Sequence, residues 1–234
     1  MEKVLYEGKS KLVCAALDEQ NCIIRYKDTA TAFDGKKKEE LHGKGALNAA
    51  ISNFIYRYLE DNGVKTHFIK ALDETSVLVK RAEIIMVEVI VRNVAAGSFS
   101  RKYGVPEGYW LKNAAVEFSL KSDELGDPMI NATQITALGI ASKAELEELV
   151  QTALKINKLL VELFMKAGIK LIDFKLEFGR SGDGIILCDE ISPDSCRLWE
   201  DGTDKKLDKD RFRQELGGVT EGYADVLRRL KSVG

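Results

Sequence analysis

The feature that most constrains the fold is the segment Leu171–Gly179, in which polar and apolar side chains alternate. Because alternate side chains of a strand share one face, Asp173, Lys175 and Glu177 line one side. The opposite side is apolar and carries Ile172, Phe174, Leu176 and Phe178. The pattern therefore predicts a strand that has the core on one face and chemical groups on the other.

A second strand is expected within Ile186–Trp199, and a tight turn joins the two. Residues Gly182-Asp183-Gly184 have the composition of a three-residue hairpin loop with Gly184 in the left-handed conformation. Such a loop pairs Ser181 with Ile185 and sets Glu177 directly opposite Asp189. A two-residue turn would shift the register by one residue and move Asp189 to the other face.

The two facing carboxylates, Glu177 and Asp189, predict a divalent-cation site, because directly opposed like charges destabilise a sheet without a counter-ion. In nucleotide-dependent enzymes Mg²⁺ is held by one or two carboxylates, while water and phosphate oxygens fill the other positions. The alternative is that both acids pair with Lys175 and Arg197 as a solvated salt-bridge face. We favour the metal site.

Composition narrows the class of protein. The 35 basic and 37 acidic residues nearly cancel, so we expect no nucleic-acid or membrane surface. No apolar stretch approaches the roughly 20 residues of a bilayer span, and no signal segment opens the chain, which favours a cytoplasmic protein. The cysteines lack C-x-x-C spacing and are expected to be reduced, buried thiols: Cys14, Cys22, Cys188 and Cys196.

The order of elements predicts an α+β fold with two lobes. Residues 1–83 read as short strands interrupted by one helix over 46–59, and form a β-rich N-terminal lobe. Residues 84–234 form a larger α+β lobe, with an apolar strand over 84–92 and a helix over 143–167 opened by a Ser142/Glu145 capping box. Because helices and hairpins occur in blocks, a doubly wound sheet is disfavoured.

Two clusters are suited to anions. Gly8, Lys9 and Lys11 lie in a turn between the first strands, where backbone amides and ammonium groups can cradle a triphosphate. A solvated turn at a sheet edge is the alternative. Arg92 ends a buried strand, and Gly97 and Ser98 then open a short helical turn, which together form an anion site. The alternative for Arg92 is an ion pair with Glu88 or a C-terminal acid.

Two further segments contribute candidates. Arg197 follows a turn downstream of Asp189, where its guanidinium can hold a phosphate or carboxylate in bidentate fashion. Residues 28–35 read as a polar loop, in which Asp34 can reach the amino group of a ligand. The lysine run over residues 36–38 is interpreted as a solvated, mobile segment.

These segments together resemble the SAICAR synthetase family across nearly the whole chain. The motifs that carry the resemblance are residues 6–11, 32–35, 44–45, 88–92 with 97–98, 171–179 and 189–199. One departure is Met86, where the family pattern usually has proline. The resemblance implies a two-lobed fold related to ATP-grasp and kinase-like architectures, with ATP in the cleft between the lobes.

The resemblance also implies a reaction, in which L-aspartate is joined to carboxyaminoimidazole ribotide (CAIR) while ATP is cleaved, through an acyl phosphate. It implies Mg²⁺ at Glu177 and Asp189, and ATP phosphates at Gly8, Lys9 and Lys11. It assigns the ribotide phosphate to Arg92, Ser98 and Arg197 beside Gly97, and the reacting side of the substrates to Asp34, Asp173 and Lys175. Family members are often dimers, so a homodimer is possible. A small-molecule kinase and a nucleotide-sensing module remain the alternative functions.

Overall fold

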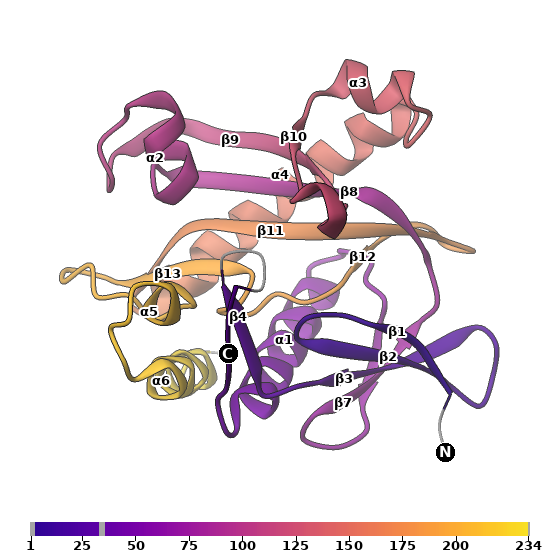
Figure 1. Cartoon of the computed structure of the whole chain (residues 1–234), viewed down its shortest axis with the longest axis horizontal. Coiled ribbons are helices and arrows are strands. Elements are labelled where there is room, and N and C mark those ends of the chain that lie inside the picture. Colours follow the sequence, from indigo (N-terminus) through magenta and orange to yellow (C-terminus); the bar gives the residue numbers. More distant parts are fainter. Residues whose placement is uncertain (1–2, 33–35, 234) are drawn as a thin grey trace.

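Two antiparallel sheets form the framework of the computed structural model, which describes residues 3–32 and 36–233 (Figure 1). The first sheet has five strands, in the spatial order β1 (Val4–Glu7), β2 (Lys11–Ala15), β3 (Asn21–Tyr26), β7 (Ser76–Lys80) and β6 (Phe68–Ala71). The second has six, with β10 (Met129–Ile130), β9 (Trp110–Leu120), β8 (Glu83–Val94), β11 (Ile169–Ser181) and β12 (Gly184–Cys188) in order, and β13 (Cys196–Glu200) also on β11.

The sheets divide at the predicted joint, since β7 ends at Lys80 and β8 begins at Glu83. One main hydrophobic core nevertheless joins them. It contains Val77 and Val79 of the first sheet together with Val87 and Val89 of the second. The lobe boundary at residue 83 therefore stays a prediction about folding units, because the packing is continuous across it.

Two long helices cover this core. Helix α1 (Lys44–Asp61) packs against β3 and β6, and α4 (Lys143–Lys166) packs against β11 and β8. The predicted capping box opens α4: Ser142 Oγ accepts the Glu145 amide, and the Glu145 carboxylate accepts the Ser142 amide. These bonds satisfy amides that a helix start otherwise leaves without partners. The short helices between β8 and α4 are α2 (Gly97–Tyr103), the 3₁₀ turn η1 (Asp123–Leu125) and α3 (Ala132–Ala137).

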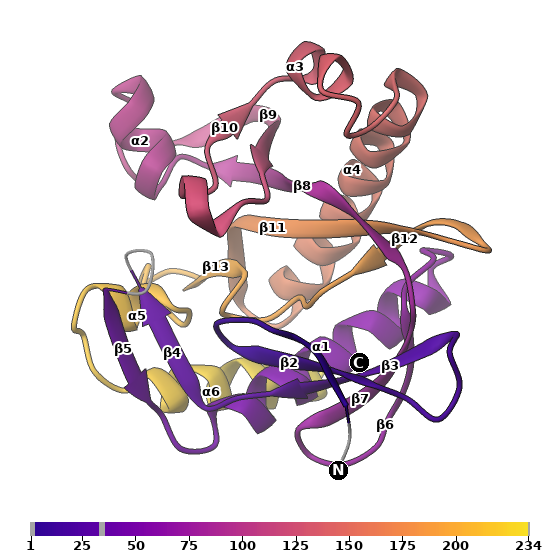
Figure 2. The same cartoon turned by 45° about the vertical axis from the view of Figure 1, so that its right-hand side comes forward.

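The C-terminal helices return to the N-terminal half of the chain. Phe212 of α5 (Asp210–Arg213) and Tyr223 of α6 (Val219–Lys231) pack on Ala30 and Ala32 of β4 (Thr29–Ala32), and α6 also lies along α1 (Figure 2). β4 pairs with β5 (Lys37–Glu40). The prediction of a polar loop is therefore wrong for residues 29–32, because Ala30 and Ala32 are buried under α5 and α6. The lysine run is part of a strand from Lys37 onward, although its side chains stay largely exposed.

The hairpin between β11 and β12 has a different register from the predicted one. Ser181 pairs with Gly184, and Glu177 pairs with Cys188, so the loop has two residues, Gly182 and Asp183. The prediction that Ser181 pairs with Ile185 and that Glu177 directly opposes Asp189 is wrong. Gly184 does have a positive φ of 93°, as expected. Asp189 lies one residue beyond the end of β12.

The alternation along β11 is interrupted once. Between Leu171 and Asp173 the strand has one residue more than its partner β13, which is a β-bulge. Leu171 therefore packs in the main core with Phe174, Leu176 and Phe178, whereas Ile172 packs in a separate cluster with Trp199. The prediction that Ile172 shares the face of Phe174 is wrong, because the bulge reverses the alternation.

Strands β12 and β13 pair with opposite ends of the same edge of β11, since β8 occupies the other edge. Residues 189–195 cross the gap between them, outside any strand. The four cysteines are free and buried, as predicted. Across residues 3–32 and 36–233, the helices are too short or too polar to span a membrane.

Candidate active site

A cavity of about 370 Å³ brings together half of the predicted site residues. Its lining includes Lys9, Arg92, Ser98, Asp173, Lys175 and Arg197. A larger cavity of about 860 Å³, between α3, α4 and β9, contains none of them. Because the smaller cavity is mostly polar and concentrates charged groups, it is the better candidate for chemistry.

One end of the cavity is built from two arginines around a buried carboxylate. Arg92 Nη1 donates to Asp173 at 2.8 Å, and Arg197 Nη1 donates to the same Oδ2 atom at 2.8 Å. The pairing of Asp173 with Arg92 across β11 and β8 places these groups side by side. Arg92 Nη2 also donates to Ser98 Oγ at 3.3 Å. The predicted anion residues are therefore together, and the ion pair of Arg92 is with Asp173 and Glu117, not with Glu88.

Gly97 is required at this end for a steric reason. A Cβ atom there would lie 2.5 Å from Nη2 and 2.8 Å from Cζ of Arg197. Its φ of 56° is also in the left-handed region, where other residues are strained. The glycine therefore lets the Arg197 guanidinium lie directly against the start of α2, where backbone amides face outward.

The other end of the site is a network of lysines and acids. Lys11 donates to Asp189, and its Nζ lies 2.8 Å from Glu190 Oε1. Burial lowers the pKa of Lys11, but Asp189 and Glu190 outweigh this effect and raise it well above its usual value. Burial likewise raises the pKa of Asp189, yet Lys11 and Lys175 hold it well below its usual range. Both groups are therefore charged at neutral pH.

Glu177 has a different cross-strand neighbour from the predicted one. It pairs directly with Glu88 on β8, and Lys175 Nζ bridges the two carboxylates at 2.9 and 2.6 Å. Burial raises the pKa of Glu88 against the effect of Lys175. Lys175 is thus the counter-ion that the opposed acids Glu88 and Glu177 require. This finding partly supports the alternative interpretation, in which the acids belong to a salt-bridge face.

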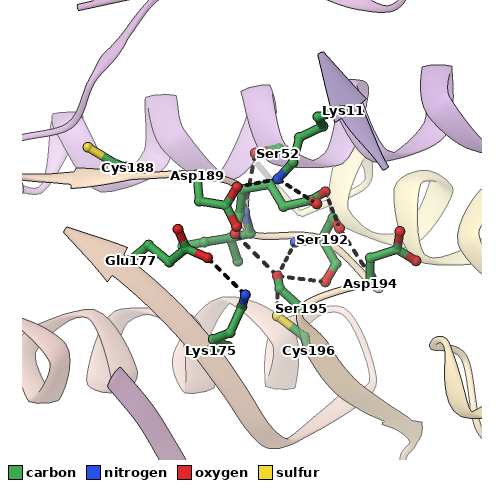
Figure 3. Close-up of polar contacts among 12 residues, drawn as sticks. Lys11, Ser52, Lys175, Glu177, Cys188, Asp189, Ser192, Asp194, Ser195 and Cys196 are labelled. Atoms are coloured by element: carbon green, nitrogen blue, oxygen red, sulfur yellow. Dashed lines mark hydrogen bonds and ion pairs between the residues drawn. The ribbon is translucent and has the colours of Figure 1, made fainter. Parts of the chain in front are cut away.

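Glu177 and Asp189 nevertheless point into the same space (Figure 3). Asp189 has a φ of 65°, which turns the chain at the end of β12. Both carboxylates raise the pKa of Lys175 and of Lys121, against the effect of burial, so both act on the same ammonium groups. The two-residue loop between β11 and β12 takes Asp189 out of direct pairing with Glu177. The left-handed conformation of Asp189 nevertheless brings the two carboxylates close to each other.

This pair of acids fits a magnesium ion held jointly with a ligand. Within residues 3–32 and 36–233, no three His, Cys, Asp or Glu side chains gather as a complete metal site. Two carboxylates facing one space suit Mg²⁺, which keeps water and substrate phosphates as its other ligands. Four lysines nearby would neutralise the same phosphates: Lys9, Lys11, Lys121 and Lys175.

The turn between β1 and β2 reaches toward the second sheet. The Lys9 ammonium lies 2.7 Å from Asp123 in η1, and Lys9 also lines the cavity. The Gly8 amide donates to the Lys11 carbonyl at 2.8 Å, which closes the turn. Asp34, the remaining predicted site residue, lies outside the described residues.

The sequence reasoning missed several cavity residues, among them the charged side chains of Asp194, Lys209 and Arg213. Lys209 and Arg213 are four residues apart at the start and end of α5, so they share a face. Burial, together with Arg213, lowers the pKa of Lys209, while Asp194 opposes this. The spacing of the two cations was visible in the sequence, but nothing local indicated that α5 lies against the cavity.

The chain is similar throughout to proteins of one family. A model of the family "SAICAR synthetase" matches residues 4–230. A phosphoribosylaminoimidazole-succinocarboxamide synthase from Coprothermobacter proteolyticus is 53% identical over 236 residues, which covers 100% of both chains. The crystal structure of the corresponding synthase from Ehrlichia chaffeensis has a TM-score of 0.96 and 45% identity, covering 99% of this chain and 100% of that one. A SAICAR synthetase in complex with ADP has a TM-score of 0.94 and 45% identity, covering 97% of each.

Proposed function

The chain belongs to the SAICAR synthetase family, and we propose that its polar cavity is where L-aspartate is joined to CAIR. It is an ATP-dependent carbon–nitrogen ligase of purine biosynthesis, and the reaction releases SAICAR, ADP and phosphate. The observation that carries the assignment to this cavity is its two-ended charge pattern. One end has paired arginines, and the other has lysines beside acidic side chains.

We assign the ATP phosphates to the lysine end, at Gly8, Lys9 and Lys11. A relative in complex with ADP supports nucleotide binding in this family. Lys11 is already charged and buried beside Asp189, so it meets an incoming phosphate without further desolvation. Mg²⁺ would be held by Glu177 and Asp189, and when bound it would neutralise charge on the phosphates.

We assign the ribotide phosphate to the arginine end. Arg92 and Arg197 present fixed guanidinium groups, and Ser98 adds a hydroxyl within 3.3 Å of Arg92. Guanidinium groups bind phosphate in bidentate fashion, which fixes orientation as well as position. Asp173 holds both arginines in place before the substrate arrives. Its second role is to face the ribotide itself, together with Lys175 and Asp34.

The chemistry follows from this arrangement. The γ-phosphoryl group of ATP passes to a carboxylate oxygen of CAIR, and ADP leaves. The aspartate amine then attacks the acyl carbon, the bond to the phosphate oxygen breaks, and inorganic phosphate leaves as the amine loses its proton. No side-chain nucleophile is needed, so the protein acts by neutralising charge and positioning the reactants.

We assign the carboxylates of L-aspartate to Lys209 and Arg213, two cavity cations that we have not assigned to ATP or to the ribotide phosphate. Both line the cavity on the side of Asp194 and Ser195. L-aspartate carries two carboxylates, and each needs a cation in a desolvated site. Burial and Arg213 lower the pKa of Lys209, which is the state expected of a lysine that awaits an anion.

An ADP-release assay with each substrate omitted in turn tests the proposed reaction. Release should require ATP, CAIR and L-aspartate together. Phosphorylated CAIR or ADP formed without L-aspartate would instead identify a small-molecule kinase. Tight binding of all three substrates without turnover at saturating Mg²⁺ would identify a sensing module.

We further propose that the protein works in the cytosol as a homodimer. Four free, buried cysteines suit a reducing compartment. The edge strand β1 exposes Val4, Leu5 and Tyr6, with 51%, 43% and 55% of their surface accessible. Exposed apolar side chains on an edge strand suit a subunit contact. Light scattering after gel filtration should give twice the 26.0 kDa chain mass, and the chain mass itself would reject the dimer.

A further inference from the structure

Helix α1 carries four buried polar side chains at intervals of four residues: Lys44, Asn48, Ser52 and Tyr56. Each has 2% or less of its surface exposed. We call these residues the α1 ladder. Residues four apart lie on one face of a helix, so the four form a single polar stripe inside the molecule. Burial of polar groups is unfavourable without hydrogen bonds, and a helix face that meets a core is normally apolar.

Three members of the ladder hold the segment that follows β12. Tyr56 Oη donates to the Cys188 carbonyl at 2.8 Å, and the Ile191 amide donates to Ser52 Oγ at 3.2 Å. The Lys44 ammonium lies 2.5 Å from Asp194 Oδ2. The segment thus runs antiparallel to α1 and is tied to it at three of the four ladder positions. Figure 3 shows Ser52 on α1 beside this segment.

The held segment contains Asp189 in an unfavourable conformation. Its φ of 65° is in the left-handed region, which a non-glycine residue keeps only where its surroundings impose it. Tyr56 bonds Cys188, the residue before Asp189, and Ser52 bonds Ile191, the second residue after it. His67 supports the same turn, since its amide donates to the Leu187 carbonyl at 2.9 Å and its ring meets Tyr56 edge-on at 5.3 Å.

We propose that Tyr56 and Ser52 are positioning residues that hold Asp189 toward the nucleotide-bound metal. This inference rests on the proposed function, because it assumes that Asp189 is a magnesium ligand. Groups that orient a ligand through one further contact typically contribute about 10–100-fold to metal affinity. Tyr56 Oη bonds the Cys188 carbonyl and Ser52 Oγ bonds the Ile191 amide, so both act through the main chain of residues 188–191.

Calorimetric titration with ADP, in Mg²⁺ and then in EDTA, tests the proposal on variants of the full chain. Tyr56→Phe removes one hydroxyl and keeps the ring. It should weaken Mg²⁺-dependent ADP binding about tenfold and leave binding in EDTA unchanged. In an Asp189→Asn background the same substitution should have no further effect, because the ligand that it positions is already lost.

Tyr58→Phe is the matched control. It removes the same hydroxyl from the same helix, but Tyr58 Oη donates to the Leu159 carbonyl on α4 at 3.4 Å, away from the turn. Equal effects of Tyr56→Phe and Tyr58→Phe, or an undiminished effect of Tyr56→Phe in the Asp189→Asn background, would overturn the inference. Ser52→Ala repeats the test if Tyr56→Phe does not fold. If Asp189→Asn alone leaves Mg²⁺-dependent binding intact, the proposed metal site fails instead.

Discussion

At the scale of single residues, the charged groups of the cavity are already paired with one another before any ligand binds. Asp173 neutralises Arg92 and Arg197, while Lys175 bridges Glu88 and Glu177. A ligand therefore exchanges partners with these groups, and does not have to desolvate isolated charges. Substitutions at the two ends of the cavity should accordingly have separable effects.

Glu177→Gln should abolish most turnover with little loss of folding. Loss of groups that only orient a metal ligand costs about 10–100-fold, so loss of a ligand should lower turnover about a hundredfold or more. The fold should persist because Gln still accepts from Lys175, which also keeps its bond to Glu88. Steady-state kinetics and thermal unfolding measure the two effects. The exposed Glu74→Gln is the control, and near-normal turnover of Glu177→Gln at ordinary Mg²⁺ would remove Glu177 from the site.

Arg197→Ala should chiefly raise the KM for CAIR. A charge-assisted hydrogen bond contributes roughly 1.5–3 kcal/mol, which corresponds to about ten- to hundredfold in affinity. The exposed Arg101→Ala, near the other end of α2, is the control. Initial rates at varied CAIR, ATP and L-aspartate distinguish the substrates. An effect confined to ATP would move Arg197 to the nucleotide end.

His67 should make the free energy of unfolding depend on pH. Burial lowers the pKa of His67 from 6.5 to about 4. As pH falls below about 6.5 the unfolded chain binds a proton that the folded chain excludes, so stability is lost between pH 6.5 and 4. The loss should reach about 3 kcal/mol, since one pKa unit corresponds to about 1.4 kcal/mol.

Urea unfolding at several pH values measures this loss. His67→Gln cannot titrate and should flatten the dependence. His42→Gln is the control, because it makes the same substitution at a fully exposed side chain. An unchanged slope in His67→Gln would contradict the prediction.

At the scale of elements, periodicity identified strands and helices better than it identified how they pair. The apolar stripe of α4 and its capping box were both visible locally, because each depends on residues within one or two turns. The register of the β11–β12 hairpin was not visible locally, because the sequence Ser-Gly-Asp-Gly suits both a two-residue and a three-residue loop. The β4–β5 pair was missed because its stability depends on α5 and α6, far along the chain.

Ser142→Ala should destabilise the protein by about 1 kcal/mol. The substitution removes the side-chain acceptor for the Glu145 amide at the start of α4, and loss of a helix N-cap has this typical cost. Ser122→Ala is the matched control, because Ser122 also precedes a helical turn but makes no side-chain cap there. Denaturant midpoints compare the two. Equal destabilisation would mean that the cap does not contribute.

At the scale of the whole molecule, the site is built between two sheets that share a core. Lys11 comes from the first sheet and Asp189 from the segment beyond β12, and the two bond directly. The Lys9–Asp123 pair spans the same gap at the surface. A ligand bound between them contacts both halves, so its binding free energy should add to the stability of the whole fold.

Magnesium and ADP together should therefore raise the melting temperature. At a ligand concentration about 100 times Kd the folded state gains about 2.7 kcal/mol. Differential scanning fluorimetry with ADP and Mg²⁺, with ADP and EDTA, and with Mg²⁺ alone separates the contributions. A shift of equal size with ADP in EDTA would mean that the metal has no part in nucleotide binding.

The sequence by itself determined the class of fold and most of the chemical inventory. Alternating side chains specified β11, and the motifs around Lys11, Arg92, Asp189 and Arg197 indicated anionic ligands. These signals are local, so they can be read without knowing what packs against them. Their resemblance to one family then supplied the reaction, which spacing alone does not encode.

The tertiary structure decided which groups meet. Glu177 faces Glu88, not Asp189, and a left-handed Asp189 turns its carboxylate back toward the same space. The roles of Tyr56 and Ser52 also became visible only when α1 was seen beside residues 188–194. Such contacts join residues more than 130 positions apart, and they depend on packing that no local pattern specifies.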